Sequence, residues 1–251
     1  MAKGKGVKKR LDLVLVEKGL IRSRDRAKAI IMAGNVLVND IRVDKPGTQI
    51  KSDAVIKVKE EDHPYVSRGG LKLEKALDYF PVSVQDAVCM DVGASTGGFT
   101  DCLLKNGAKK VFSVDVGYGQ LDWSLRSDDR VVVIERTNIR HLEYEVVNQS
   151  MDMVVADTSF ISLKTVIPSA EKFMRNGTQI LALIKPQFEA GREHVGKGGV
   201  VKDPEVRKQV VNDISAFFNE RGYKVNGTVT SPILGPKGNE EYIIFLDFKK
   251  K

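Results

Sequence analysis

The chain has 251 residues, 42% of them hydrophobic, and it carries a formal net charge of +7. This composition is ordinary for a globular protein of one or two domains, and no apolar run approaches the roughly 18 residues that a membrane-spanning helix needs. The charged start, Met1 to Gly6, lacks the apolar segment of a secretory signal, so we expect a cytoplasmic protein. Cys89 and Cys102 lie in apolar settings, as expected of buried free thiols, and neither has a neighbouring Cys or His with which to bind a metal.

The positive charge is concentrated in the first quarter of the chain. Residues 1–62 hold 15 Lys and Arg against 9 Asp and Glu, whereas the remaining residues hold 25 against 24. A basic module joined to a nearly neutral one suggests one part that binds a polyanion and another that carries out chemistry. The alternative for the charge alone is a solvated basic face.

The basic part is predicted to be a small α+β module. Its expected elements, in chain order, are a helix over 11–19 that Gly19 ends, a second helix that Ser23 caps, a hairpin of 36–38 and 41–43, and a strand over 55–58.

This order of elements, together with the run from Arg22 to Lys28 and the run from Gly34 to Asn39, resembles the small RNA-binding domain named after the fourth protein of the small ribosomal subunit. The resemblance implies a basic surface that holds structured RNA mainly through its phosphates. The residues that would contact RNA are Arg10, Arg22, Arg24, Arg26 and Lys28. The Lys-rich start would add a mobile, salt-sensitive arm.

A polar, acidic stretch that ends in His63-Pro64 follows this module and is predicted to be a linker. We therefore expect a basic RNA-binding domain over 1–59, a linker over 60–66 and a second domain over 67–251. In this interpretation His63 is a linker residue rather than a catalyst.

The second domain alternates strands and helices, which predicts an α/β fold. Strands are expected over 87–91, 111–115, 131–135, 152–156, 179–184, 223–230 and 242–248, and helices over 97–106, 163–175 and 204–221. The first five strands need crossover connections and should be parallel, whereas the last two are joined by a short Gly/Pro-rich loop and should pair antiparallel. By resemblance, this is a Rossmann-like methyltransferase fold with a seven-stranded, mostly parallel sheet.

A glycine turn links the first of these strands to its helix. It reads Asp-Val-Gly-Ala-Ser-Thr-Gly-Gly-Phe-Thr over 91–100, which is neither a GxGxxG dinucleotide motif nor a phosphate loop. It resembles the first motif of S-adenosylmethionine-dependent methyltransferases, and the alternative is an α/β domain that binds no nucleotide. The resemblance implies that the cofactor is bound by Asp91, Gly93, Ala94, Ser95, Thr96, Gly97, Gly98 and Phe99, and by Asp115 through the ribose. Asn138 follows the third strand, whose end also borders the pocket, and is a candidate adenine or cofactor contact that could equally be a loop cap.

Four charged residues stand at strand ends or in the adjoining loops, where a doubly wound sheet places its site: Lys72, Asp157, Lys185 and Glu241. Such half-buried charges need partners, which they can provide to one another. The alternative is a purely structural ion-pair network.

Four motifs surround these residues: Ser-Arg-Gly-Gly-x-Lys-Leu at 67–73, Ala-Asp-Thr-Ser-Phe-Ile-Ser-Leu at 156–163, Ile-Lys-Pro-Gln-Phe-Glu at 184–189 and Gly-Asn-x-Glu-Tyr at 238–242. Together they resemble the haemolysin A/TlyA family, which joins the same RNA-binding domain to an FtsJ-like ribose 2′-O-methyltransferase. The resemblance implies methylation of cytidine ribose in ribosomal RNA or ribosomal subunits. Lys185 would act as base or electrostatic stabiliser, Asp157 would orient Lys185, and Glu241 would orient Lys72 or the hydroxyl.

Two other methylation chemistries do not fit the residues. The motif after the fourth strand has no proline, unlike the Asp/Asn-Pro-Pro-Tyr/Phe of amino-group methyltransferases, and no Cys stands there for attack on a pyrimidine ring. Two alternatives to methylation stay open: a membrane-active haemolysin, and an RNA-binding ribosome-assembly factor without catalysis. The oligomeric state is not predicted, and Gly196 to Gly199 is expected to be a mobile flap or a surface loop.

Overall fold

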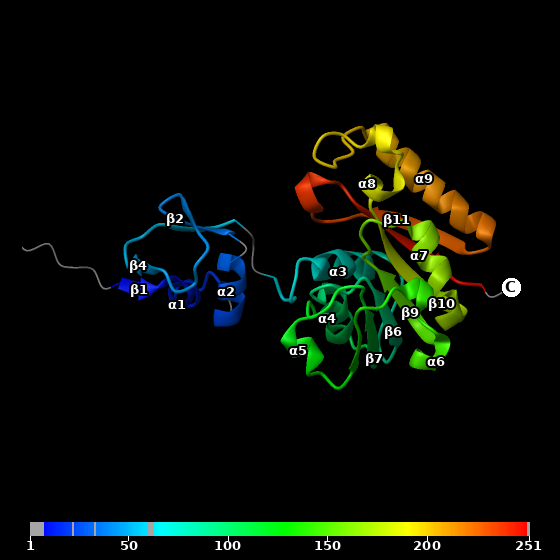
Figure 1. Ribbon diagram of the computed structural model, residues 1–251, viewed down its shortest axis with the longest axis horizontal. Helices are drawn as coiled ribbons and strands as arrows, with labels where there is room; N and C mark the ends of the chain where they lie inside the picture. The colour runs from blue at the N-terminus through cyan, green and yellow to red at the C-terminus, as the bar shows by residue number, and fades with distance from the viewer. Residues whose placement is uncertain (1–7, 22, 33, 60–62, 250–251) are drawn as a thin grey trace, which may run out of the picture. The chain divides into compact units, whose positions relative to one another are not determined.

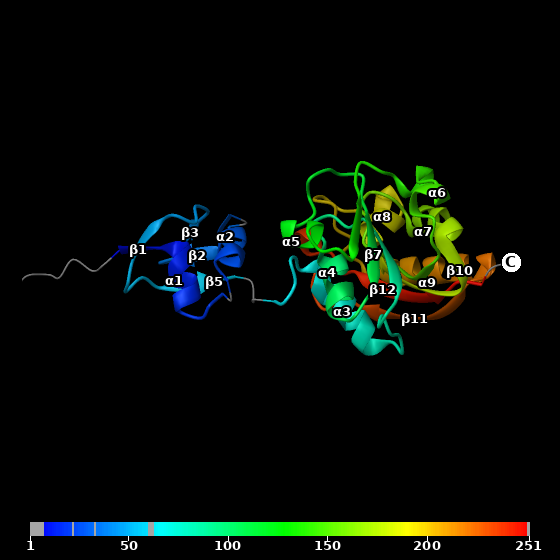
Figure 2. The ribbon, with the colours of Figure 1, turned by 90° about the horizontal axis from the view of Figure 1, so that it is seen from below.

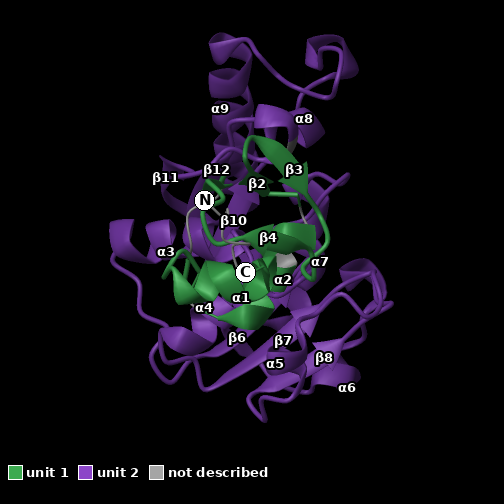
Figure 3. Cartoon of the chain, turned by 90° about the vertical axis from the view of Figure 1, so that its left-hand side faces the viewer, with its two compact units in different colours: residues 1–64 green, residues 65–251 purple. Residues whose placement is uncertain are grey.

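The chain folds into two compact units, residues 1–64 and 65–251 (Figure 3). The structure is a computed structural model, and it describes residues 8–21, 23–32, 34–59 and 63–249. The predicted RNA contact Arg22, most of the predicted N-terminal arm, and residues 60–62 of the predicted linker lie outside the described residues.

Unit 1 is built from two helices and two small antiparallel sheets. The helices are α1 (Leu11–Glu17) and α2 (Arg24–Met32). The three-stranded sheet has the order β3-β2-β5, and β1 pairs with β4; the bounds are β1 (Lys8–Arg10), β2 (Val36–Val38), β3 (Ile41–Val43), β4 (Gln49–Lys51) and β5 (Ile56–Val58).

Local chemistry accounts for the elements of unit 1 that the sequence predicts. The hydroxyl of Ser23 accepts a hydrogen bond from the Arg26 backbone N–H and so caps α2. Asn39 and Asp40 both adopt positive φ, which is the turn geometry that suits a tight hairpin. Strands β1 and β4 were not predicted, because β1 reads Lys-Lys-Arg and has no apolar alternation.

Unit 2 contains a seven-stranded sheet with the order β11-β12-β10-β9-β6-β7-β8 (Figures 1 and 2). Its five strands from β10 to β8 run parallel, whereas β12 is antiparallel to both β10 and β11, so the predicted sheet is confirmed. The bounds are β6 (Val88–Val92), β7 (Lys110–Val114), β8 (Val131–Ile134), β9 (Met151–Ala156), β10 (Met174–Ile184), β11 (Lys224–Thr230) and β12 (Tyr242–Asp247).

Helices cover both faces of this sheet, and alternating strand residues supply two separate cores (Figure 2). Cys89 and Val155 pack under α3 (Gly69–Tyr79), α4 (Gly98–Lys105) and α5 (Trp123–Arg126). Met90 and Val154 pack under α6 (Tyr144–Val147), α7 (Leu163–Ala170) and α9 (Pro204–Arg221). Both cysteines are free and buried.

Three local differences from the predicted elements have physical reasons. Helix α3 begins with Gly69-Gly70, which are poor helix formers, so the sequence pattern does not predict it. The helix expected over 163–175 ends at Ala170 and continues as a 3-10 turn, Glu171–Phe173. Strand β10 begins at Met174 instead of the expected residue 179, and a register shift between Met174 and Gln179, where Gly177 has a positive φ, interrupts its pairing with β9. None of the helices within the described ranges has the length and apolar character to span a membrane.

Candidate active site

Three neighbouring strands bring the functional motifs to one edge of the sheet. The register pairs Val92 and Ala182 with Ala156 from either side, so the carboxyl ends of β6, β9 and β10 lie together. The glycine turn follows β6, Asp157 follows β9, and Lys185 follows β10. This edge is where open α/β sheets place their ligands.

The four predicted charged residues form one continuous chain of ion pairs, which we call the tetrad. Lys185 Nζ lies 2.6 Å from Asp157 Oδ1, and Lys72 Nζ lies 3.8 Å from Asp157 Oδ2. Lys72 Nζ also donates a 2.7 Å hydrogen bond to Glu241 Oε2. The tetrad is therefore a Lys-Asp-Lys-Glu series in which Asp157 bridges the two ammonium groups.

Burial makes the tetrad sensitive to any loss of a partner. Glu241 is fully buried, Lys72 and Lys185 are nearly so, and the Asp157 side chain keeps 20% of its surface exposed. Two positive and two negative groups balance one another, which offsets the cost of removing each from water. Lys185 also donates to the hydroxyl of Ser159 at 3.1 Å, so its position is fixed from two sides.

Glycine is required where the turn after β6 passes the tetrad. Gly93 has a φ of +86°, and a Cβ there would lie 2.8 Å from the backbone oxygen of Asp157. The glycine turn and the strand end that carries Asp157 are therefore in direct backbone contact.

Two adjoining cavities open at this edge. The smaller, of about 350 Å³, is lined by the glycine turn and by Lys72, Asp157 and Lys185. The larger, of about 540 Å³, is lined by the ends of β7 and β9 and includes Asp115 and Asn138. Gly93, Ser95, Asp157 and Ser159 line both cavities, so a single elongated ligand could occupy the two together.

The predicted cofactor residues divide between the cavity walls and the layer behind them. Those that line a cavity are Gly93, Ala94, Ser95, Gly98, Phe99, Asp115 and Asn138. Asp91, Thr96 and Gly97 do not line either cavity. Gly97, at a φ of +98°, precedes the first residue of α4, and the Thr96 carbonyl accepts a hydrogen bond from the Asp122 N–H.

Asp115 joins the glycine turn to the loop after β7. Its Oδ2 accepts a 2.8 Å hydrogen bond from Ser95 N, and its Oδ1 accepts a 2.6 Å bond from Gly117 N. Asn138 has the role of a cap, since its side-chain oxygen accepts from the Arg140 N–H at 3.1 Å while the residue also lines the larger cavity.

Asp91 lies beneath the turn in a fully buried hydrogen-bond network. Its Oδ2 accepts from the backbone N–H and the hydroxyl of Thr100, at 3.0 and 2.7 Å, and that hydroxyl also contacts Ser113 Oγ. Its Oδ1 has no hydrogen-bond partner among the described residues. Burial raises the pKa of Asp91 to about 7, against the opposing effect of the Thr100 bonds.

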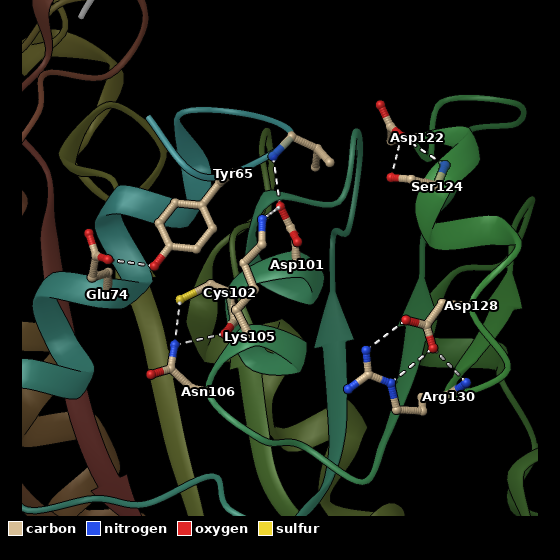
Figure 4. A network of polar contacts seen from close by, with 11 residues as sticks. Tyr65, Glu74, Asp101, Cys102, Lys105, Asn106, Asp122, Ser124, Asp128 and Arg130 are labelled. Carbon is tan, nitrogen blue, oxygen red and sulfur yellow. Dashed lines mark hydrogen bonds and ion pairs between the residues drawn. The ribbon is translucent and has the colours of Figure 1, made fainter. Parts of the chain in front are cut away.

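A second polar network fastens the helix that carries Lys72 to the helix that begins at the glycine turn (Figure 4). Val66 N and Lys105 Nζ both donate to Asp101 Oδ2 at 2.8 Å, and Tyr65 Oη donates to Glu74 at 2.6 Å. Tyr65 and Val66, which the sequence analysis places in the linker, thus pack within unit 2, whereas His63 is buried in unit 1.

Several cavity residues are missed by the sequence analysis. Ser159 and Phe160 lie two and three residues after Asp157, so their position in the motif is a signal that could have identified them. Phe160 adopts a positive φ of 63°, which is rare for an aromatic residue, and its exposed ring lies 4.9 Å from that of Phe188. Ile233, Leu234 and Gly235 line the smaller cavity from the Gly/Pro-rich loop between the last two strands, whose composition predicts a turn but not a contribution to the site.

The four predicted RNA contacts that lie within the described residues have partners in unit 1. Arg10 and Arg24 both pair with the buried carboxylate of Asp12, and Lys28 pairs with Asp25. Arg26 contacts His63. The pKa of Asp12 is lowered to about 2 by its bond to Arg10 and, to a lesser extent, its bond to Arg24.

Comparison with known proteins agrees with this geometry. Residues 65–248 match the model of the FtsJ-like methyltransferases, and residues 9–56 match the S4 domain. The chain belongs to the FtsJ-like methyltransferase family. The predicted fold class, enzyme class and family resemblance are therefore confirmed.

Several relatives are similar along nearly the whole chain. The "16S/23S rRNA (cytidine-2'-O)-methyltransferase TlyA" of Mycobacterium tuberculosis is 46% identical over 94% of this chain and 89% of its own length. "Hemolysin A" of Brachyspira hyodysenteriae is 44% identical over 93% and 98%. A solved structure from Streptococcus thermophilus, of a protein provisionally named a hemolysin, is 44% identical, with a TM-score of 0.76 over 97% of this chain and 90% of that one.

The buried carboxylate of this FtsJ-like unit yields a prediction about pH. Because the folded-state pKa of Asp91 is about 7, above its ordinary value of 3.8, the folded protein binds the proton more tightly than the unfolded chain. The contribution of this proton to the free energy of unfolding is fully present below pH 4 and is lost as the pH rises to about 7. Asp91→Asn keeps an oxygen that can accept from Thr100 but cannot ionise.

Chemical denaturation between pH 4 and 8 measures this effect. We expect the variant to gain stability relative to the wild type as the pH rises, by up to about 4 kcal/mol above pH 7. The exposed Asp129→Asn is the matched control and should leave the pH profile of the wild type unchanged. Parallel profiles for the wild type and Asp91→Asn would contradict the assignment.

Proposed function

We propose that the protein transfers a methyl group from S-adenosylmethionine to the ribose 2′-hydroxyl of a cytidine in ribosomal RNA. The observation that carries the proposal is the tetrad, assembled beside the glycine turn with Lys72, Asp157 and Lys185 in the wall of the smaller cavity. The name of the TlyA relative, a cytidine-2′-O-methyltransferase of 16S and 23S rRNA, supports the choice of substrate.

The cavities fit the proposed cofactor. Thr158 Oγ1 is buried without a hydrogen-bond partner among the described residues, and its residue lines the larger cavity, so a ligand there could supply the partner. Each carboxylate oxygen of Asp115 accepts one backbone N–H and retains capacity to accept from a ribose hydroxyl. Asp115 and Asn138 would hold the nucleoside end of S-adenosylmethionine, and the glycine turn would hold its amino-acid end. When bound, the cofactor supplies an electrophilic methyl group on a sulfonium.

The remaining requirements fall on the tetrad. The ribose hydroxyl has to be aligned with the methyl carbon and has to lose its proton as the new O–C bond forms and the C–S bond breaks. Alignment alone can lower the barrier by about 7–11 kcal/mol. Lys185 either accepts the proton or, as a cation, stabilises the developing oxyanion while the proton leaves to solvent. Asp157 and Ser159 fix the amine in the cavity wall for either role.

Unit 1 is proposed to bind the RNA substrate, in agreement with its S4 match. Arg10, Arg24, Arg26 and Lys28 remain proposed phosphate contacts together with Arg22, because an arginine or lysine that already has one partner keeps further N–H donors. To these we add two further cations as proposed contacts.

Lys8 and Lys51 lie directly opposite each other in the β1–β4 pair, and neither has a carboxylate partner among the described residues. Like charges placed in this way repel, and a phosphate would relieve the repulsion. Both line a groove of about 550 Å³ that also includes Asn39, Thr48 and Gln49. We therefore propose this groove as a site for the RNA backbone.

Removal of the Lys185 amine tests the proposed chemistry. Lys185→Ala is expected to lower kcat by about 10²–10⁴-fold, because a positioned proton acceptor or oxyanion stabiliser is lost. S-adenosylmethionine affinity should change less than threefold, since the turn and Asp115 remain. The rate of methyl transfer to purified ribosomal subunits, with the modified nucleotide mapped, measures kcat. Calorimetry with S-adenosylmethionine measures the affinity for the cofactor. Lys208→Ala, on the exposed side of α9, is the control; full activity of Lys185→Ala would contradict the role.

Salt dependence tests the proposed groove of unit 1. The double variant Lys8→Ala/Lys51→Ala should bind RNA more weakly and reduce the slope of log K against log salt by roughly 1.5–2, because two phosphate contacts are lost. Fluorescence titration against a ribosomal RNA fragment at several salt concentrations measures the slope. Lys9→Ala, on the same strand but paired with Glu17, should change it less. An unchanged slope in the double variant would exclude the groove.

A further inference from the structure

The short helix α8 (Pro186–Glu189) begins directly after Lys185 and contacts the other half of the tetrad through Gln187. Gln187 Nε2 donates a 3.2 Å hydrogen bond to Glu241 Oε1, while Lys72 Nζ donates to Oε2 of the same carboxylate. Gln187 therefore joins the Lys72–Glu241 pair to the turn that carries Lys185.

We propose that Gln187 is a positioning residue of the active site, which holds the Glu241 carboxylate in the orientation that aims Lys72 at Asp157. The inference deepens the proposed methyl transfer and depends on it only for its kinetic readout. Gln187 lines neither cavity, so it acts through Glu241 and not on the substrate.

Burial explains why Glu241 needs this second donor. Its side chain is wholly inaccessible to solvent, and a buried carboxylate oxygen without a hydrogen bond is costly. The backbone of Gly235 passes close by, since a Cβ there would lie 2.2 Å from Glu241 Oε1. Without the Gln187 amide, the Oε1 atom would be left in this tight space with no donor among the described residues, and the carboxylate would turn toward Lys72.

Such a rotation would change the tetrad because Lys72 is shared. Its Nζ lies 2.7 Å from Glu241 and 3.8 Å from Asp157, so stronger attraction to Glu241 would withdraw it from Asp157. Asp157 would then pair with Lys185 alone. Loss of the Gln187 amide is thus expected to change the charges of Asp157 and Lys185 that would face the ribose hydroxyl.

The contact with Glu241 sets the orientation of the Gln187 amide. A carboxylate only accepts hydrogen bonds, so the nitrogen of the amide has to face Glu241. The amide oxygen is buried and has no hydrogen-bond partner in the described part of the chain. The contact with Glu241 is therefore the polar interaction that places this side chain.

The α8 turn itself is anchored by other residues. The carboxylate of Glu189 accepts from Ser162 Oγ at 2.6 Å and from Leu163 N at 2.8 Å, which ties the turn to the loop that follows Asp157. The ring of Phe188 packs on that of Phe160 in the same loop. Substitution of Gln187 should consequently leave Lys185 in place and affect the Lys72–Glu241 pair.

A change of Gln187 to Glu gives a readout that a packing role would not produce. Gln187→Glu has nearly the same shape but puts a second carboxylate beside Glu241, where it can donate only after one of the pair binds a proton. We expect kcat at pH 8.5 to fall tenfold or more and to recover, relative to wild type, as the pH is lowered to 6. The KM for S-adenosylmethionine should stay within twofold of wild type. Gln187→Met, which has similar volume and no donor, should lose activity at every pH without recovery.

The chain offers a matched control in α9. Gln209 Nε2 donates a 2.7 Å hydrogen bond to Asp213 Oδ1 on an exposed surface, so Gln209→Glu makes the same chemical change away from the site. It should leave kcat unchanged between pH 6 and 8.5. Thermal unfolding followed at each pH establishes that the variants are folded over this range.

Two outcomes would overturn the inference: wild-type kcat in both Gln187 variants, or a loss in folded Gln187→Glu that does not recover in acid. Crystal structures of wild type and Gln187→Met give a readout independent of activity. We expect the Lys72–Asp157 separation to be longer in the variant, and an unchanged tetrad would overturn the inference. If the wild type itself transfers no methyl group to ribosomal subunits, the proposed function fails, and the crystallographic comparison still decides the role of Gln187.

Discussion

The structure of the site depends on the carboxylate of Asp157, which lies between two buried ammonium groups. It approaches Lys185 through one oxygen and Lys72 through the other. The backbone of the same residue also lies against the glycine turn, where only Gly93 leaves enough room. Asp157 thus links the glycine turn to the lysines that would handle the proton in the proposed reaction, so its position at the end of β9 constrains both.

The four charges of the tetrad neutralise one another, and the residues around them hold each charge close to its partner. A buried lysine without its carboxylate would be more costly than the pair, and the pair stabilises only when the geometry is good. Gly235 leaves space for Glu241, Ser159 and Asp157 fix Lys185, and the network around Asp101 holds α3 against α4. These contacts come from segments far apart in the sequence, so the site exists only in the folded sheet. The distances between the charged groups of the site are therefore set by the packing of the sheet and its helices.

Much of this arrangement follows from the sequence, and the exceptions have identifiable causes. Apolar runs and crossover lengths predict five parallel strands, and the carboxyl ends of parallel strands necessarily share an edge, which brings Asp157 and Lys185 together. The sequence does not predict the helix that carries Lys72, since its glycines resemble a turn. The sequence also does not predict the role proposed for Gln187, because a glutamine in a four-residue helix has no periodic signal and its partner lies 54 residues away. The RNA contacts of unit 1 show a third limit: charge counts locate a basic module, but they do not reveal that Asp12 already binds two of its arginines.

The division of charge between the two units suggests how affinity and chemistry are separated. Unit 2 has almost equal numbers of acidic and basic residues, and the cations of its tetrad are neutralised by their own carboxylates. Such a site exerts little long-range attraction on RNA, because a balanced, buried group of charges produces a weak field outside the protein. Attraction of the polyanion would therefore rest mainly on unit 1, whose surplus of positive charge is not fully consumed by internal pairs. A catalytic unit whose lysines were free to bind phosphate would gain affinity, but it would place phosphate where a sugar hydroxyl has to sit. If the proposed function holds, neutralising those lysines internally would keep the cavity selective for the ribose hydroxyl, and the separate basic unit would supply the affinity for RNA that is lost.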